Sequence, residues 1–273
     1  MKGLGVSHGA VSVMNAIPCG IGSTIGISLR TEVRIESSEG QIVSLVDRPK
    51  VGPTLAETCV RRTREAIDQD TAEGYHLEIV TDIPPSMGLK SSSSVCNAVI
   101  SAVLDAYGEK MDPLDIIRLG VRCAKECKVT ITGAFDDACG CGLGGLVVTD
   151  NTKDELLLRK EIPEYDVIIC VPDETIPKSK VPVDRYRGLS DVYSEMVPRI
   201  EDDYLNVMTE NGRYVEGIID RPSGHARKAL EEGALAAGIT GTGPATAIIA
   251  KKGDGQRIAG SIDCRKILAT TRC

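Results

Sequence analysis

The sequence contains no tryptophan and a single phenylalanine among its 273 residues, and aromatic residues make up only 3% of the chain. Proteins that bind single-stranded nucleic acids stack bases on exposed aromatic rings, so this composition argues against that class. The formal net charge of −7 points the same way, because nucleic acids and anionic membrane surfaces attract basic proteins. We therefore expect neither a nucleic-acid partner nor a membrane partner.

Long apolar segments are also missing. No run approaches the ~18 consecutive apolar residues of a transmembrane helix. The segment from Met1 to Leu4 lacks the apolar core of a secretion signal, which leads us to expect a cytoplasmic protein. The length suits one large domain or two lobes that share a cleft.

The ten cysteines indicate neither a disulfide framework nor a zinc motif. The chain is too long, and its cysteines too scattered, for a small disulfide-rich domain. The close pairs, Cys123 with Cys127 and Cys139 with Cys141, lack the Cys-x-x-Cys spacing typical of zinc sites. We expect most cysteines to be small apolar core residues, and we predict no structural metal site.

Two common nucleotide-binding patterns are absent. Neither Gly-Lys-Ser nor Gly-Lys-Thr occurs in the chain, which excludes the P-loop. Residues Gly140–Gly145 match G-x-G-x-x-G, but they precede the strand-like stretch Leu146–Thr149 instead of opening a helix. This segment is therefore not expected to bind a dinucleotide.

The most informative segment that is present runs from Pro84 to Ser94, with the sequence PPSMGLKSSSS. It follows a strand-like stretch (Tyr75–Ile83) and precedes an apolar-periodic stretch (Val95–Leu104), so its serines are expected at a helix N-terminus. Unpaired N–H groups and the positive end of the helix dipole make such a place suitable for phosphate, and Gly88 lets a ligand approach the backbone. The alternative is a serine-capped helix that binds no ligand.

This loop resembles the second motif of the GHMP kinase superfamily, Pro-x-x-x-Gly-Leu-small-Ser-Ser-small. Pro84, Gly88, Leu89 and Ser91–Ser93 match it. Lys90 departs from the motif, because most members have Gly, Ser or Ala there; a lysine either points into solvent or adds positive charge to the phosphate site. The variant Gly-Leu-Lys-Ser-Ser-Ser is similar to the archaeal shikimate kinases, a branch of this superfamily.

Two further glycine clusters resemble the superfamily's first and third motifs, in the same order. Gly5–Ala10 with Val13–Ala16 resembles the first, and Gly238–Pro244 resembles the C-terminal glycine loop. One such cluster alone is a weak signal, because glycine is common in turns. The resemblance spans nearly the whole chain and implies an α+β fold with two lobes: a ribosomal S5-like N-terminal lobe (1–150) that carries the phosphate loop, and a ferredoxin-like C-terminal lobe (151–273).

The resemblance also implies a catalytic base and a metal ligand. Several GHMP kinases carry an aspartate seven residues before a Gly-Gly pair, which is Asp137 here, with Asp136 as the nearest alternative. In that role the carboxylate accepts the proton of the acceptor hydroxyl. Mevalonate kinases place a magnesium-binding glutamate eleven residues earlier, at Glu126, whose alternative role is that of a solvated helix residue. A serine hydroxyl would complete the Mg²⁺ ligands; Ser92 is the candidate, with its two neighbours as alternatives.

The implied activity is the ATP- and Mg²⁺-dependent phosphorylation of the 3-hydroxyl of shikimate. The candidate ATP contacts are Pro85, Ser86, Met87, Gly88, Leu89, Lys90, Ser91, Ser92, Ser93, Ser94, Gly241, Thr242 and Gly243. His8 and Asn15 of the first motif, and Arg185 and Arg187, which suit a carboxylate, are the candidate contacts to shikimate. The alternatives are a kinase for homoserine or mevalonate, or a nucleotide-binding protein of this fold without catalysis. No oligomeric state is predicted.

Overall fold

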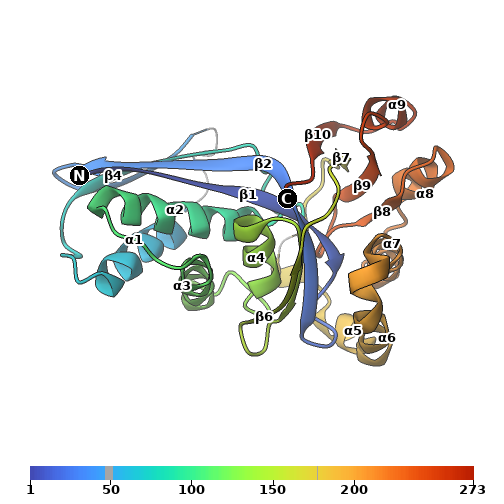
Figure 1. Cartoon of the computed structure of the whole chain (residues 1–273), viewed down its shortest axis with the longest axis horizontal. Helices are drawn as coiled ribbons and strands as arrows, with labels where there is room; N and C mark the ends of the chain where they lie inside the picture. The colour runs from blue at the N-terminus through green and yellow to red at the C-terminus, as the bar shows by residue number, and fades with distance from the viewer. Residues whose placement is uncertain (47–51, 177) are drawn as a thin grey trace.

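The computed structural model describes residues 1–46, 52–176 and 178–273, and it contains two β-sheets with helices packed against them (Figure 1). The first sheet has the strand order β3-β4-β2-β5-β6, with β1 paired to β2; the second has the order β10-β7-β9-β8. The strands are β1 (Lys2–Met14), β2 (Ile21–Ser37), β3 (Gln41–Leu45), β4 (Tyr75–Thr81), β5 (Leu146–Asp150), β6 (Glu155–Lys160), β7 (Tyr165–Cys170), β8 (Ala236–Ile239), β9 (Thr246–Lys251) and β10 (Lys266–Thr270). This arrangement confirms the α+β class.

The first four helices lie on one side of the first sheet, and the later ones lie in the part of the molecule that carries the second sheet (Figure 1). The α-helices are α1 (Thr54–Ala66), α2 (Ser91–Tyr107), α3 (Pro113–Glu126), α4 (Phe135–Leu143), α5 (Val183–Arg187), α6 (Ser190–Met196), α7 (Ile200–Ile218), α8 (Gly224–Glu231) and α9 (Gly255–Gly260). Short 3₁₀ turns occupy Lys178–Lys180 and Val197–Arg199. Across the described ranges, no helix is both long and apolar enough for a membrane crossing.

Helix α2 is the element that the phosphate loop was expected to open, and it does so. The expected helix began at Val95, whereas the observed one begins at Ser91, because Lys90 adopts a left-handed conformation (φ 66°) that ends the loop. Gly108, also left-handed, ends the helix. The serines therefore form the first turn of the helix.

The boundary between the two sheets differs from the expected division at residue 150. The stretch 155–159 was assigned to the second lobe, but β6 pairs antiparallel with β5 and so belongs to the first sheet. The second sheet begins only with β7, at Tyr165. If the lobes are defined by their sheets, the boundary between them lies between Lys160 and Tyr165.

One hydrophobic core joins the two sheets. It contains Val11 and Ile25 from the first sheet, Ile169 and Ile249 from the second, and Met208 from α7, all essentially buried. A separate core lies between the first sheet and helices α1, α2 and α3. The joint core fixes the second sheet against the end of β1, where the candidate site lies.

Strand β1 was not predicted, because its small residues give no clear alternation of apolar and polar positions. They serve close packing instead, since α2 runs alongside β1 (Figure 1). A β-carbon added at Gly5 would overlap the carbonyl oxygen of Ala98 and would lie 2.5 Å from the amide nitrogen of Ala102, both in α2. Glycine at position 5 therefore sets the distance between the strand and the helix.

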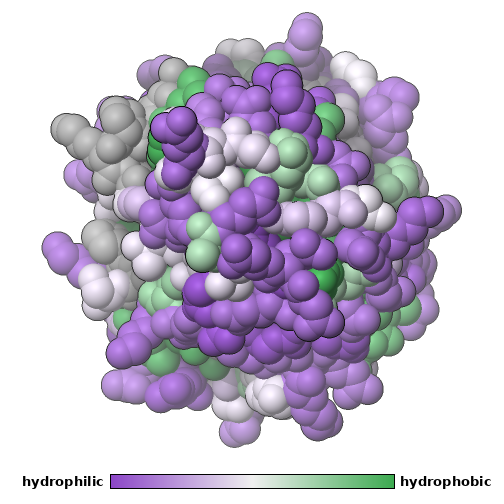
Figure 2. Space-filling view, turned by 90° about the vertical axis from the view of Figure 1, so that its left-hand side faces the viewer, coloured by the Kyte–Doolittle hydropathy of each residue, from purple (hydrophilic) through white to green (hydrophobic). Residues whose placement is uncertain are grey.

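The end of the molecule that carries the N-terminus is mostly hydrophilic, with small, separate apolar areas (Figure 2). Exposed apolar side chains in the described ranges include Leu4, Ile42 and Val80, each 40–49% exposed. Scattered residues of this kind are normal on a protein surface and do not by themselves indicate a binding site.

The substitution Gly5→Ala should lower the free energy of unfolding by ~1–3 kcal/mol, because the new methyl group overlaps backbone atoms of α2 that cannot move alone. Gly40→Ala is the matched control: a β-carbon there meets no atom within 4 Å, so the change should stay within about 0.5 kcal/mol. Urea denaturation of both variants measures the difference. Equal stabilities would show that β1 and α2 are not held this closely.

Candidate active site

A buried ion pair lies at the start of α2. The Nζ atom of Lys90 is 2.7 Å from Oδ1 of Asp137, with side-chain exposures of 5% and 22%. Burial works against the charge of Lys90, but the carboxylates of Asp137 and Asp136 outweigh it, so the pKa of the Lys90 amine lies above its usual value. Of the two orientations that the sequence left open for Lys90, the inward one is therefore observed.

Ser12 of β1 connects this ion pair to the C-terminal glycine loop. Lys90 Nζ donates a hydrogen bond to Ser12 Oγ (2.7 Å), and the amide of Gly241 donates to the same oxygen (3.1 Å). The Ser12 amide donates to Oγ1 of Thr240 (2.9 Å), which in turn donates to the Gly88 carbonyl (3.2 Å). The phosphate loop, the glycine loop and β1 thus meet at one place.

Gly88 is required by this arrangement. Its φ of +74° is a left-handed conformation, and an added β-carbon would overlap the Thr240 carbonyl oxygen. Any larger residue would push the two loops apart. Gly88 therefore allows the two loops to pack closely against each other. The sequence had predicted only that it lets a ligand approach the backbone.

The first turn of α2 offers groups that suit phosphate. No side chain caps the helix at Lys90, which leaves the first amides of the helix without a capping acceptor. Ser91, Ser92 and Ser93 are half-buried, and their hydroxyls form no hydrogen bond within the described part of the chain. Lys90, whose ammonium group pairs with Asp137, is the residue directly before this turn.

Several other side chains of the phosphate loop anchor it to the interior of the protein. Met87 and Leu89 are buried in the core that joins the two sheets. Ser94 is fully buried and donates its hydroxyl to Oγ1 of Thr31 (2.9 Å), so its side chain is already engaged within the fold. Pro85 and Ser86 are exposed at the edge of the loop.

Asp136, the alternative base, is buried behind Asp137. Its Oδ1 accepts a hydrogen bond from Asn151 Nδ2 (2.7 Å), and its amide donates to Oδ1 of Asn151 (3.0 Å). Burial, and next the charge of Asp137, raise the pKa of Asp136 to about 7. The geometry favours Asp137 as the carboxylate that an acceptor can approach, because it is the more exposed of the two.

Glu126 is not brought to this site. It ends α3, and its two carboxylate oxygens pair with Arg61 and Arg62 of α1 at 2.5 and 2.8 Å. These ion pairs lie on the surface, with Glu126 38% exposed. The spacing of eleven residues before Asp137 therefore does not place Glu126 beside the serines, and its alternative role as a solvated helix residue fits the structure.

The two arginines predicted for the acceptor lie in α5. Arg185 is already paired, with Asp220 and with the carbonyl of Gly217 (2.7 Å). Arg187 is 68% exposed and lies 3.8 Å from Asp184. Within the described residues, neither arginine contacts Lys90 or Asp137.

His8 and Asn15 of the first motif have different environments. Ser7 donates its hydroxyl to Cys141 in α4, so the neighbouring His8 points to the opposite face of the sheet. Burial, followed by the charges of Arg272 and Arg30, lowers the pKa of His8 to about 4. Asn15 is buried and donates to the carbonyl of Gly241 (3.0 Å), so it supports the glycine loop.

The glycine loop itself closes on its own backbone and on β1. The Gly241 amide is used by Ser12, and the Gly243 amide donates to the carbonyl of Thr240 (3.0 Å). Thr242 is half-buried. Sequence reasoning missed Ser12 and Thr240, and no local signal would have found them, because their partners lie 78 to 229 positions away.

Comparison with known proteins identifies the relatives of this chain. Residues 54–145, which include the phosphate loop, Lys90 and Asp137, match the GHMP kinases N-terminal domain. Over 254 residues the chain is 42% identical to the shikimate kinase of Methanothrix thermoacetophila, covering 91% of this chain and 85% of that protein. It is 35% identical to the shikimate kinase of Pyrococcus furiosus, covering 89% and 90%.

Solved structures share the fold at lower identity. The mevalonate kinase of Methanococcus jannaschii superimposes with a TM-score of 0.80 at 15% identity, over 100% of this chain and 99% of that one. The homoserine kinase of Cytophaga hutchinsonii gives 0.74 at 17%, over 100% and 95%. Since residues 54–145 match the GHMP kinases N-terminal domain and the curated relatives match about nine-tenths of the chain, the chain belongs to the GHMP kinase family.

Proposed function

We propose that this protein is a shikimate kinase, which transfers the γ-phosphoryl group of ATP to the 3-hydroxyl of shikimate. The observation that carries the proposal is the similarity to shikimate kinases, at 33–42% identity over about nine-tenths of the chain. The geometry of the candidate site supplies the chemistry, because the partly exposed carboxylate of Asp137 pairs with the buried ammonium of Lys90, the residue that precedes α2.

Asp137 is the proposed general base. Its carboxylate is held by Lys90 and remains partly exposed, so it can accept the proton of an acceptor hydroxyl. Phosphoryl transfer leaves the protein little covalent work, because catalysis rests on positioning and on stabilising the transferred negative charge. Lys90 contributes to both, since its ammonium orients Asp137 and leaves a positive charge where Ser12 and the glycine loop meet.

The residues of the candidate site are suited to binding a nucleoside triphosphate. A positive-φ glycine, unpaired helix amides and free serine hydroxyls form the kind of cradle that binds phosphate. The backbone of residues 86–93 and the hydroxyl of Thr242 would hold the phosphate groups. When bound, ATP supplies the phosphoryl group and Mg²⁺ screens its negative charge.

Magnesium has fewer protein ligands here than the sequence suggested. The hydroxyls of Ser91, Ser92 and Ser93 remain candidates, with Ser92 as our choice, whereas Glu126 is occupied by two arginines. Mg²⁺ usually keeps several waters and needs only one or two protein oxygens in addition to phosphate. A site built on one serine is therefore sufficient.

The acceptor is tested by measuring ADP formation with shikimate, homoserine and mevalonate under identical conditions. We expect turnover with shikimate, and a kcat/KM at least about 10²-fold higher than with the other two alcohols, because a site built for polar groups rejects analogues that leave them unpaired. Preference for homoserine or mevalonate would make the chain a different GHMP kinase. Tight ATP binding without turnover on any acceptor would indicate a non-catalytic nucleotide-binding protein.

Replacing the proposed base separates chemistry from binding. Asp137→Asn keeps the side-chain volume but cannot take a proton, so kcat should fall by roughly 10²–10⁴-fold while ATP affinity changes little. Asp136→Asn is the matched control at the adjacent position and should reduce kcat less, because Asp136 is buried behind Asp137. Steady-state kinetics with calorimetric ATP binding measure both quantities; the reverse order of effects would assign the base to Asp136.

The buried Asp136 should make stability depend on pH. Its pKa is about 7 in the folded chain against an ordinary 3.8, so the folded state holds the proton more tightly. The stabilising contribution is complete below pH ~4 and is lost as pH rises to about 7; the loss is at most about 4 kcal/mol.

Asp136→Asn mimics the protonated acid, so its free energy of unfolding should decline less than that of wild type between pH 4.5 and pH 8. Asp184→Asn, at a fully exposed position, should follow the wild-type profile. Denaturant titrations at pH 4.5, 6 and 8 measure the three curves. Parallel curves for wild type and Asp136→Asn would show that Asp136 titrates normally in the folded chain.

A further inference from the structure

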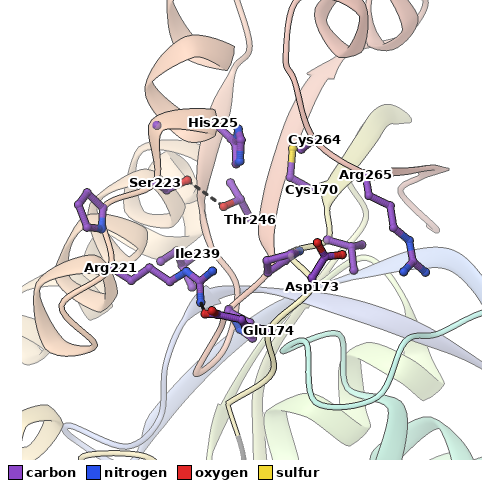
Figure 3. A pocket seen from close by; sticks show the side chains of 15 residues that line it. Cys170, Asp173, Glu174, Arg221, Ser223, His225, Ile239, Thr246, Cys264 and Arg265 are labelled. Atoms are coloured by element: carbon purple, nitrogen blue, oxygen red, sulfur yellow. Dashed lines mark hydrogen bonds and ion pairs between the residues drawn. The ribbon is translucent and has the colours of Figure 1, made fainter.

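A cavity of about 490 Å³ lies in the C-terminal part of the molecule, between the second sheet and the start of α8. Its walls come from the end of β7, the start of β9, the residues before β10, and the segment that leads into α8 (Figure 3). Lys90, Asp137 and the serines of α2 do not line it. The cavity therefore borders the glycine loop, through Ile239 and Pro244, but does not reach the ion pair of the candidate active site.

Three metal-binding side chains meet on one wall of this cavity. The sulfur atoms of Cys170 and Cys264 and a ring nitrogen of His225 all lie within 4.8 Å of one another. Figure 3 shows His225, at the start of α8, facing Cys170 at the end of β7 and Cys264 in the bend before β10. Within the ranges that the structure describes, no fourth histidine, cysteine or carboxylate joins this group at that distance.

The backbone holds two of these side chains in place. Cys170 is the last residue of β7 and pairs with Lys266 of β10, while the amide of Val171 donates to the carbonyl of Arg265 (2.9 Å). This pairing sets Cys264 beside Cys170. Cys170 is buried and Cys264 is half-buried, so the two sulfur atoms are close without depending on mobile surface loops.

His225 comes from the first turn of α8, which is also fixed. Ser223 caps that helix by accepting a hydrogen bond from the amide of Ala226 (3.1 Å), and its hydroxyl shares a hydrogen bond with Thr246 of β9 (2.8 Å). The helix start is therefore tied to the second sheet. The imidazole itself is exposed, which leaves it free to turn toward a cation.

The donor set selects a thiophilic cation. Two thiolates and one imidazole favour Zn²⁺ over Mg²⁺ or Ca²⁺, which prefer oxygen ligands. In a tetrahedral zinc site, bond lengths of about 2.0–2.3 Å separate neighbouring donor atoms by roughly 3.3–3.8 Å. The three donor atoms here lie within 4.8 Å of one another, so small side-chain rotations would bring them to that spacing.

We propose that Cys170, His225 and Cys264 bind Zn²⁺, with the fourth coordination position open to the cavity. Three protein ligands and one open position are an arrangement that zinc adopts in proteins, with water or a small ligand as the fourth donor. A cation held there would link α8 to β7 and to the segment before β10. Because the folded chain alone assembles these three donors, the metal should also stabilise it.

Cobalt reports the site directly, because Co²⁺ bound to thiolates gives a charge-transfer band in the near ultraviolet and visible bands when it is tetrahedral. The whole chain, reduced and freed of metal with a chelator, is titrated with Co²⁺ and then with Zn²⁺. We expect both sets of bands to saturate at one Co²⁺ per chain and to disappear as Zn²⁺ replaces it. Absence of a thiolate band in the reduced protein would overturn the proposal.

Two ligand variants locate the cation. In His225→Gln and Cys264→Ser the dissociation constant for Co²⁺ should rise by at least about 100-fold, since loss of a direct ligand should exceed the ~10–100-fold cost of losing an outer partner. Cys273→Ser, an exposed cysteine outside the cluster, and His76→Gln are the matched controls and should bind Co²⁺ as wild type does. Unchanged binding in the ligand variants would place the metal elsewhere and overturn the assignment.

Thermal unfolding supplies an independent readout. Zn²⁺ should raise the melting temperature of the wild-type chain by several degrees and leave that of His225→Gln unchanged. The His225 variant decides the question even if Cys264→Ser folds poorly, because position 225 is exposed. An equal rise in both proteins would show that the stabilising cation does not use this histidine.

Discussion

The buried charge of Lys90 is the constraint on which the candidate site depends. Removing an ammonium group from water costs several kcal/mol unless it is paired and hydrogen-bonded. Asp137 supplies the pair and Ser12 supplies the second acceptor, each at 2.7 Å. Those two residues lie on α4 and β1, while Lys90 itself ends the phosphate loop, so satisfying one charge requires three distant segments to meet. The same Ser12 oxygen also holds the Gly241 amide, which brings the glycine loop of the second sheet to the same point.

The two adjacent carboxylates in the first turn of α4 have different environments, and the roles that we propose for them rest on this difference. Asp136 faces inward, where Asn151 holds both its side chain and its amide, and burial raises its pKa. Asp137 faces the ammonium group and remains partly exposed. A carboxyl group that burial drives toward its neutral form stabilises the fold most at low pH, whereas a partly exposed carboxylate that an ammonium group orients can be approached by an acceptor hydroxyl. The helix places both at its N-terminus, where negative charge is favourable.

Features that depend on neighbouring residues could be predicted from the sequence, and features that depend on distant ones could not. The phosphate loop, the serine start of α2 and the glycine loop before β9 follow from local turn and helix preferences. Glu126 was predicted from its spacing to Asp137, but spacing along the chain does not determine where a side chain points. Helix α3 ends at Glu126, and its carboxylate pairs with the arginines of α1. The role of Ser12 depends on contacts 78 and 229 positions away, and the cluster of Cys170, His225 and Cys264 joins residues that no short motif connects.

The glycine loop and the cysteine–histidine cluster belong to one structural unit. The loop is fixed at both ends, because it begins where β8 ends at Ile239 and finishes where β9 begins at Thr246. Both residues also line the C-terminal cavity, and Thr246 is hydrogen-bonded to the cap of α8, two residues before His225. The strands that present Thr240 and Gly241 to the phosphate loop are therefore the strands against which α8 is fixed. A cation that ties α8 to β7 would restrain the sheet that carries the glycine loop, and so would act on the geometry of the nucleotide site without touching it.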